Sequence, residues 1–100
     1  MNNKERFIEV YKKYIHREGS DKLLEYLMSH SSDFFDAPAS ARYHGNYDGG
    51  LVEHSLNVYD CLKDYLERTR VKTTYGLNYN DESIAIVALL HDLCKINCYK

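Results

Sequence analysis

The chain has 100 residues, 44% of them hydrophobic and 28% charged, with a formal net charge of −2. This length predicts one domain, spanning residues 1–100, with a modest hydrophobic core. The mixed charge argues against a broad basic surface for nucleic acid but allows one local phosphate site. The longest apolar run has seven residues, whereas a membrane helix needs about 20, so we expect no membrane partner.

The first half of the chain predicts two amphipathic helices and a long loop. Apolar residues recur at three- and four-residue spacing over Asn3–Glu18, which indicates a helix that stops at Gly19. Ser20 is a suitable N-cap for a second helix that ends near His30. We expect residues 31–50 to form one short helical turn near Asp33–Phe35 and then a structured loop, and loops of this length are often functional.

The second half predicts two more helices. Residues Leu51–Arg68 carry one continuous apolar face. After a polar loop, Asn80 or Asp81 can cap a last helix. Its core, Ile84–Leu93, is apolar almost all round, which is typical of a helix surrounded by other helices. No stretch alternates with period two, so the sequence predicts an all-α helical bundle.

A histidine and an aspartate stand side by side in this last helix, within the stretch ALLHDLCKI. A buried carboxylate is costly unless it is paired, hydrogen-bonded or bound to a metal. Neighbours on an ideal helix point about 100° apart, so His91 and Asp92 would not face each other but could converge on a divalent cation. In the alternative interpretation, Asp92 points to solvent and His91 is a hydrogen-bonded core residue.

A second histidine-bearing stretch is YHGNYDGGLVEHSLNV, at residues 43–58. Gly49 and Gly50 allow a tight turn into the third helix, and His54 lies in its first turn. The unpaired backbone N–H groups of a helix N-terminus favour anions such as phosphate. A histidine placed there is suited to hold a metal beside such an anion.

Together, the Gly-Gly, the His four residues later, the His-Asp pair and a Lys three residues after it resemble the HD-domain superfamily of metal-dependent phosphohydrolases. The similarity spans roughly residues 38–96 and is strongest to HD domains of bacterial and phage hydrolases, including those attached to 3′–5′ exoribonucleases. It implies a helical bundle that hydrolyses a phosphoester of a nucleotide or nucleic acid.

The resemblance also implies roles for individual residues. His54, His91 and Asp92 would be metal ligands, and in members with two metals Asp92 would bridge them and so take part in catalysis. Lys95 would bind a phosphate oxygen or stabilise developing charge, and His44 would contact substrate or a second metal. A set of histidine and carboxylate ligands suits Mn²⁺, Fe²⁺, Co²⁺, Ni²⁺ or Zn²⁺.

One part of the family motif is missing, because no acidic residue follows Asp92. Asp48 and Asp60 are the nearest candidates for a fourth ligand, but neither matches the family order. We therefore expect the chain to be the N-terminal part of a longer domain, or a degenerate chain whose core a partner subunit completes in a homo-oligomer. Whether the 100 residues act as an enzyme by themselves stays open.

Two other functions fit the sequence. A non-catalytic binding module could keep the HD scaffold, with loop tyrosines at 43, 47, 75 and 79 stacking on a base. A structural zinc site could use His91, Cys94 and Cys98, which would share one face of a continuous helix. The three cysteines follow no disulfide framework and no export signal is visible, so we expect reduced thiols and a cytoplasmic protein.

Overall fold

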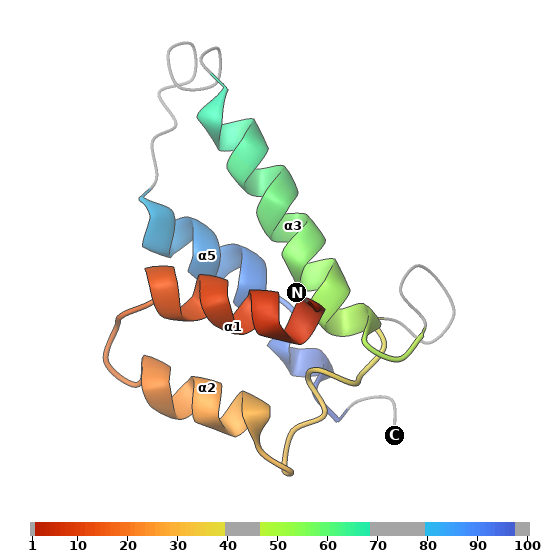
Figure 1. Cartoon of the computed structure of the whole chain (residues 1–100). Coiled ribbons are helices and arrows are strands. Elements are labelled where there is room, and N and C mark those ends of the chain that lie inside the picture. Colours follow the sequence, from red (N-terminus) through yellow and green to blue (C-terminus); the bar gives the residue numbers. More distant parts are fainter. Residues whose placement is uncertain (1, 40–46, 69–79, 98–100) are drawn as a thin grey trace.

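The computed structural model describes residues 2–39, 47–68 and 80–97. Within these ranges the chain is all-α and contains no strand, so the expected fold class is confirmed. None of the described helices is both long and apolar enough to cross a bilayer. The elements, shown in Figure 1, are the helices α1 (Asn3–Tyr14), α2 (Ser20–Met28), α3 (Gly50–Glu67) and α5 (Asp81–Leu90) and the 3-10 turn η1 (Leu93–Lys95).

The long helix α3 packs against α5, and α1 contacts both of them. Helix α2 lies beside α1 in Figure 1 and adds Leu24 and Leu27 to the same hydrophobic core. An exposed ion pair also joins α1 to α3, in which Arg6 donates to both oxygens of Asp60. The buried core residues are Phe7, Tyr11, Ile15, Leu24, Leu27, Phe34, Ala37, Leu51, Val52, Leu56, Tyr59, Leu66, Ile84, Ala85, Ala88 and Leu89.

An aromatic cluster connects α1 to the turn at residues 34–36. The ring of Phe7 is fully buried, and its centroid lies 4.9 Å from that of Phe34 and 5.5 Å from that of Phe35. Tyr11, one turn further along α1, lies 6.0 Å from Phe7. Large buried rings contribute much of the burial energy in a small domain, so this cluster fixes the first loop against the bundle.

The first helix is shorter than the sequence predicts, because α1 ends at Tyr14 and not at Glu18. Ile15 takes an extended conformation and is buried, while the next N–H, of His16, donates to the Glu82 carboxylate of α5. Gly19, with a φ of 85°, directly precedes α2 and does not end α1. Ser20 is the first residue of α2 and not its cap.

The next elements follow the prediction more closely. Helix α2 ends at Met28, before His30, and the Ser29 hydroxyl donates to the carbonyl of Tyr26. A single helical turn forms where the N–H groups of residues 36 and 37 donate to the Asp33 carbonyl. Helix α3 matches its predicted range to within one residue at each end.

The last helix departs from the prediction at its end. Asn80 caps α5 by accepting a hydrogen bond from the Ser83 N–H. The helix ends at Leu90, so Ile84–Leu93 is not one continuous helix. The sequence also predicts that other helices surround this helix. The described residues do not surround α5, because 60% of Val87 is exposed.

Replacing Phe7 by alanine should lower the free energy of unfolding by about 3–5 kcal/mol, because it removes the centre of a buried aromatic cluster. Urea denaturation followed by circular dichroism measures this. Tyr65→Ala, at a side chain that is 45% exposed, is the matched control and should change the same quantity by less than about 0.5 kcal/mol. Equal losses in both variants would contradict the placement of this cluster in the core.

The contact of Glu82 with residues 16 and 17 should make stability depend on pH. The His16 N–H and the Arg17 side chain both donate to Glu82, which lowers its pKa below the ordinary 4.5. A carboxylate with a lowered folded-state pKa stabilises the fold above its unfolded-state pKa, and this contribution is lost as the pH falls through the folded-state value.

Glu82→Gln should therefore lower the Tm at about pH 7, and the difference from the parent chain should disappear toward about pH 3. Thermal unfolding measured across this pH range tests the prediction. The control is Glu9→Gln, at an exposed position on α1. A difference in Tm that does not change with pH would count against the ion pair.

Candidate metal centre

His54 reaches the site from the first turns of α3, whose start is fixed by the preceding loop. The Gly49 N–H donates to the Asp36 carbonyl and the Leu51 N–H to the Ala37 carbonyl, both at 2.9 Å. Gly49 has a φ of 81°, a left-handed conformation that favours glycine, at the point where the chain turns into the helix. The glycine and the two hydrogen bonds together set where His54 lies.

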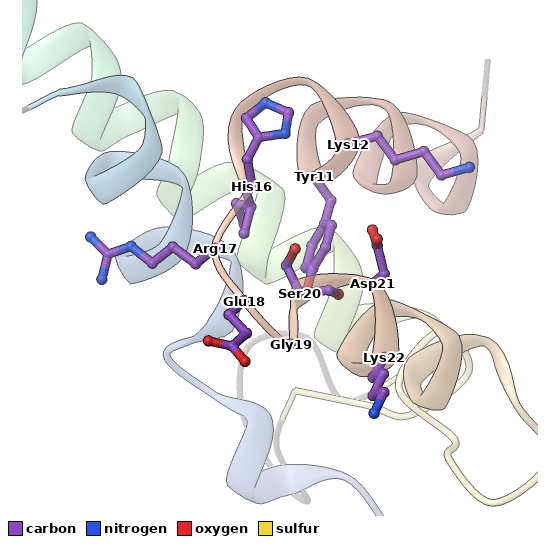
Figure 2. A pocket seen from close by; sticks show the side chains of 10 residues that line it. Tyr11, Lys12, His16, Arg17, Glu18, Gly19, Ser20, Asp21 and Lys22 are labelled. Carbon is purple, nitrogen blue, oxygen red and sulfur yellow. The ribbon is translucent and has the colours of Figure 1, made fainter.

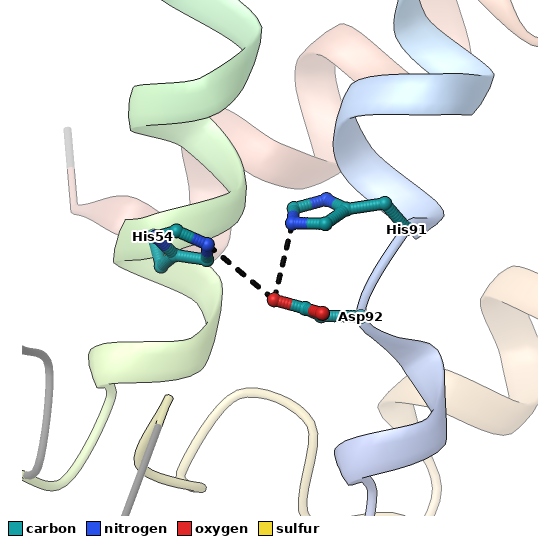
Figure 3. Close-up of side chains that lie close together, drawn as sticks. All are labelled: His54, His91 and Asp92. Atoms are coloured by element: carbon teal, nitrogen blue, oxygen red, sulfur yellow. Dashed lines mark ion pairs between the residues drawn. The ribbon is translucent and has the colours of Figure 1, made fainter.

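His91 and Asp92 come from the end of α5. His91 is the C-cap residue with near-helical dihedral angles, whereas Asp92 has left the helix at φ −110° and ψ 23°. On a continued helix the two side chains would diverge by about 100°. The break lets both point toward α3, as Figure 3 shows.

The three side chains meet at one point. Asp92 Oδ2 lies 3.1 Å from Nε2 of His91 and 3.4 Å from Nε2 of His54. The two imidazole centroids are 5.3 Å apart, and one ligand atom from each of the three residues lies within 4.8 Å of the others. Their side chains are 17–32% exposed, so the group is partly shielded and still open to solvent.

The orientation of the His91 ring is set by its own helix. Nδ1 lies 2.8 Å from the Ala88 carbonyl, which can only accept, so Nδ1 carries the hydrogen. Nε2 is then the ring nitrogen that faces the Asp92 carboxylate, at 3.1 Å. Metal-binding histidines commonly have their second nitrogen held in this way.

Lys95 lies next to the same carboxylate. Its Nζ is 3.6 Å from Asp92 Oδ2 and donates to the Ala39 carbonyl at 2.7 Å. The structure thus brings together His54, His91, Asp92 and Lys95 from two distant parts of the sequence. His44 lies outside the described residues.

Other sequence-based candidates are not part of this group. Asp60 pairs with Arg6 of α1, and the exposed Asp48 does not belong to the group found among described residues. The zinc interpretation required a continuous helix through His91 and Cys94, and the break after Leu90 removes that premise. Cys94 is exposed and outside the group, and Cys98 lies outside the described residues.

Two backbone carbonyls, and the contact of Tyr47 with Glu53, were not anticipated from the sequence. Ala88 precedes His91 by three residues, so helical spacing could have indicated that contact, whereas nothing near Lys95 in sequence points to Ala39. The Tyr47 hydroxyl donates to Glu53 at 2.5 Å, a hydrogen bond that raises the pKa of Tyr47. Of the tyrosines considered for base stacking, Tyr47 is the one within the described residues, and 48% of it is exposed.

A cavity of about 750 Å³ lies elsewhere, around the connection between α1 and α2 (Figure 2). Several of its polar groups are engaged in local contacts. The Tyr11 hydroxyl donates to the Ser20 carbonyl, Arg17 pairs with Glu82, and a ring nitrogen of His16 lies 2.7 Å from the Lys13 carbonyl. No residue that lines this cavity belongs to the His54–His91–Asp92 group.

The described residues thus form an all-α fold in which two histidines and one aspartate lie close enough together to hold a metal ion. The chain is similar to the dihydroneopterin 2',3'-cyclic phosphate phosphodiesterase of Methanocaldococcus jannaschii, with 40% identity over 63 residues. The match covers 60% of this chain and 23% of that relative, so the chain corresponds to about a quarter of its length. No family model and no solved structure matches the chain.

Proposed function

We propose that the chain carries the metal-binding part of a phosphohydrolase that acts on a phosphoester of a nucleotide, a related compound or a nucleic acid. The observation that carries this proposal is the convergence of His54, His91 and Asp92 on one point. The similarity to a protein named as a cyclic phosphate phosphodiesterase supports the reaction class. The motif resemblance to HD-domain phosphohydrolases agrees with both.

The residues fit a divalent transition-metal ion. Two imidazole nitrogens and one carboxylate oxygen are ligands that Mn²⁺, Fe²⁺, Co²⁺, Ni²⁺ and Zn²⁺ accept. The contact of Nδ1 with Ala88 leaves Nε2 of His91 as the ring nitrogen that faces Asp92 and could bind the ion. An ion bound there would supply Lewis acidity and activate a water for attack on phosphorus.

Lys95 and His44 are the proposed substrate contacts. An ammonium has three N–H donors, and those of Lys95 that are not used by Ala39 and Asp92 can bind a phosphoryl oxygen. A positive charge at that place would stabilise the negative charge that develops during hydrolysis. His44 is proposed from the motif alone.

Purified chain should bind about one equivalent of Mn²⁺ or Ni²⁺, and the variant with both His54→Ala and Asp92→Ala should bind none, because two of three ligands are gone. Elemental analysis after gel filtration measures the metal content. His30→Ala, at an exposed histidine outside the group, is the matched control and should keep the metal. A folded parent chain without metal would overturn the proposed centre.

If the chain is itself active, the metal-loaded form should hydrolyse a 2′,3′-cyclic nucleotide, and Asp92→Asn should lower kcat/KM by a factor of about 100 or more by removing a ligand charge. Phosphate-ester products are followed by phosphorus NMR.

The second candidate, a non-catalytic binding module, is favoured by the three-ligand set of the described residues. It predicts that metal and nucleotide bind without turnover.

A further inference from the structure

We infer that Lys95 is a positioning residue for Asp92, because its ammonium lies between the Asp92 carboxylate and the Ala39 carbonyl. This inference rests on the proposed metal centre and adds a second role for Lys95. In this role the residue acts through a ligand and not on the substrate. The partner that fixes it is a backbone atom 56 residues away in the sequence.

The segment that holds Lys95 also holds the opposite side of the site. The carbonyls of Asp36 and Ala37 accept the N–H groups of Gly49 and Leu51 at the start of α3, the helix that bears His54. Two residues further along the same segment, the Ala39 carbonyl accepts from Lys95. Residues 36–39 therefore connect the helix of one ligand to the turn of another.

Asp92 depends on such an anchor more than His91 does. His91 is oriented by Ala88 of its own helix, whereas Asp92 lies beyond the end of α5 in a non-helical conformation. The described polar neighbours of its Oδ2 are the two histidines and Lys95. Among these three, Lys95 is tied to the 36–39 segment, so it can set the carboxylate position against α3.

The positioning role and the charge of Lys95 have opposite effects on metal affinity. An ammonium beside a bound dication repels it, so charge alone predicts that removing Lys95 tightens metal binding. The side chain of Lys95 is 29% exposed, and solvent weakens that repulsion. Loss of a group that orients a ligand commonly weakens metal binding by a factor of about 10–100, so we expect the positioning effect to exceed the charge effect.

The first test uses the full chain without metal. Urea unfolding is measured for Lys95→Met, Asp92→Asn and the double variant. If Lys95 holds Asp92, the unfolding equilibrium constant of the double variant is about two- to fivefold smaller than independent effects would give. Lys22→Met with Asp92→Asn is the control pair and should be additive. Additivity in the Lys95 pair would overturn the inference.

The second test measures Mn²⁺ affinity by calorimetry. Lys95→Met should bind Mn²⁺ at least about tenfold more weakly than the parent chain. Lys95→Arg, which keeps a positive donor at the same position, should recover part of the loss. Lys22→Met should leave the affinity unchanged. Unchanged or tighter binding in Lys95→Met would overturn the positioning role.

The two tests separate this inference from the proposed function. If the parent chain takes up no Mn²⁺, the proposal of a metal centre is wrong. The urea unfolding of the metal-free variants then still decides whether Lys95 positions Asp92. If the parent chain binds Mn²⁺ and Lys95→Met binds it equally well, the metal centre stands and the positioning role fails.

Discussion

Two neighbouring residues of a regular helix cannot face the same point, and the candidate site depends on how the chain meets this constraint. Helix α5 ends at Leu90, which leaves His91 at its cap and Asp92 in a turn of different conformation. Both side chains then point at α3, where His54 lies one turn from the start. If α5 continued without this break, the Asp92 side chain would point about 100° away from that of His91. The two could then not both face α3.

The surroundings of the group are consistent with a cation at its centre. The C-terminal end of a helix carries a partial negative charge, which favours positive groups, and His91 stands at that end of α5 while its ring contacts the Ala88 carbonyl. Asp92 adds a full negative charge. Within the described residues, the nearest positive side chain recorded for it is Lys95, and this ammonium is itself bound to a carbonyl.

The sequence was sufficient for the fold class and for the residues that come together, but not for their geometry. Apolar periodicity located α3 to within one residue at each end, because its pattern is long and its N-terminus is marked by two glycines. It placed the end of α1 too late, because the buried Ile15 and the His16–Glu82 hydrogen bond arise from tertiary contacts. The end of α5 was placed too late for a related reason: LLHDLCKI contains neither glycine nor proline to mark a stop.

The motif spacing indicated the three proposed ligands without showing how they converge. Local spacing could have suggested the contact between His91 and Ala88. No local signal could have suggested that Lys95 reaches Ala39, because hydrogen bonds between remote segments depend on the complete packing of the chain. The same holds for Asp60, whose pairing with Arg6 makes it part of the contact between α1 and α3.

The segment that follows Asp92 and includes Lys95 and Asn97 has consequences for how the molecule folds. Asn97, which follows η1 with a φ of 59°, donates its backbone N–H to the Asp33 carboxylate, across a separation of 64 residues. With the contacts of Lys95 to Ala39 and of the Asn97 side chain to the Ser31 carbonyl, the last described segment is held by three hydrogen bonds that span 56 to 66 residues. Closing such large loops costs conformational entropy before any contact compensates for it. Contacts between remote segments form more slowly than local ones, so we expect the helices to form early and the site to assemble only when the chain closes on itself.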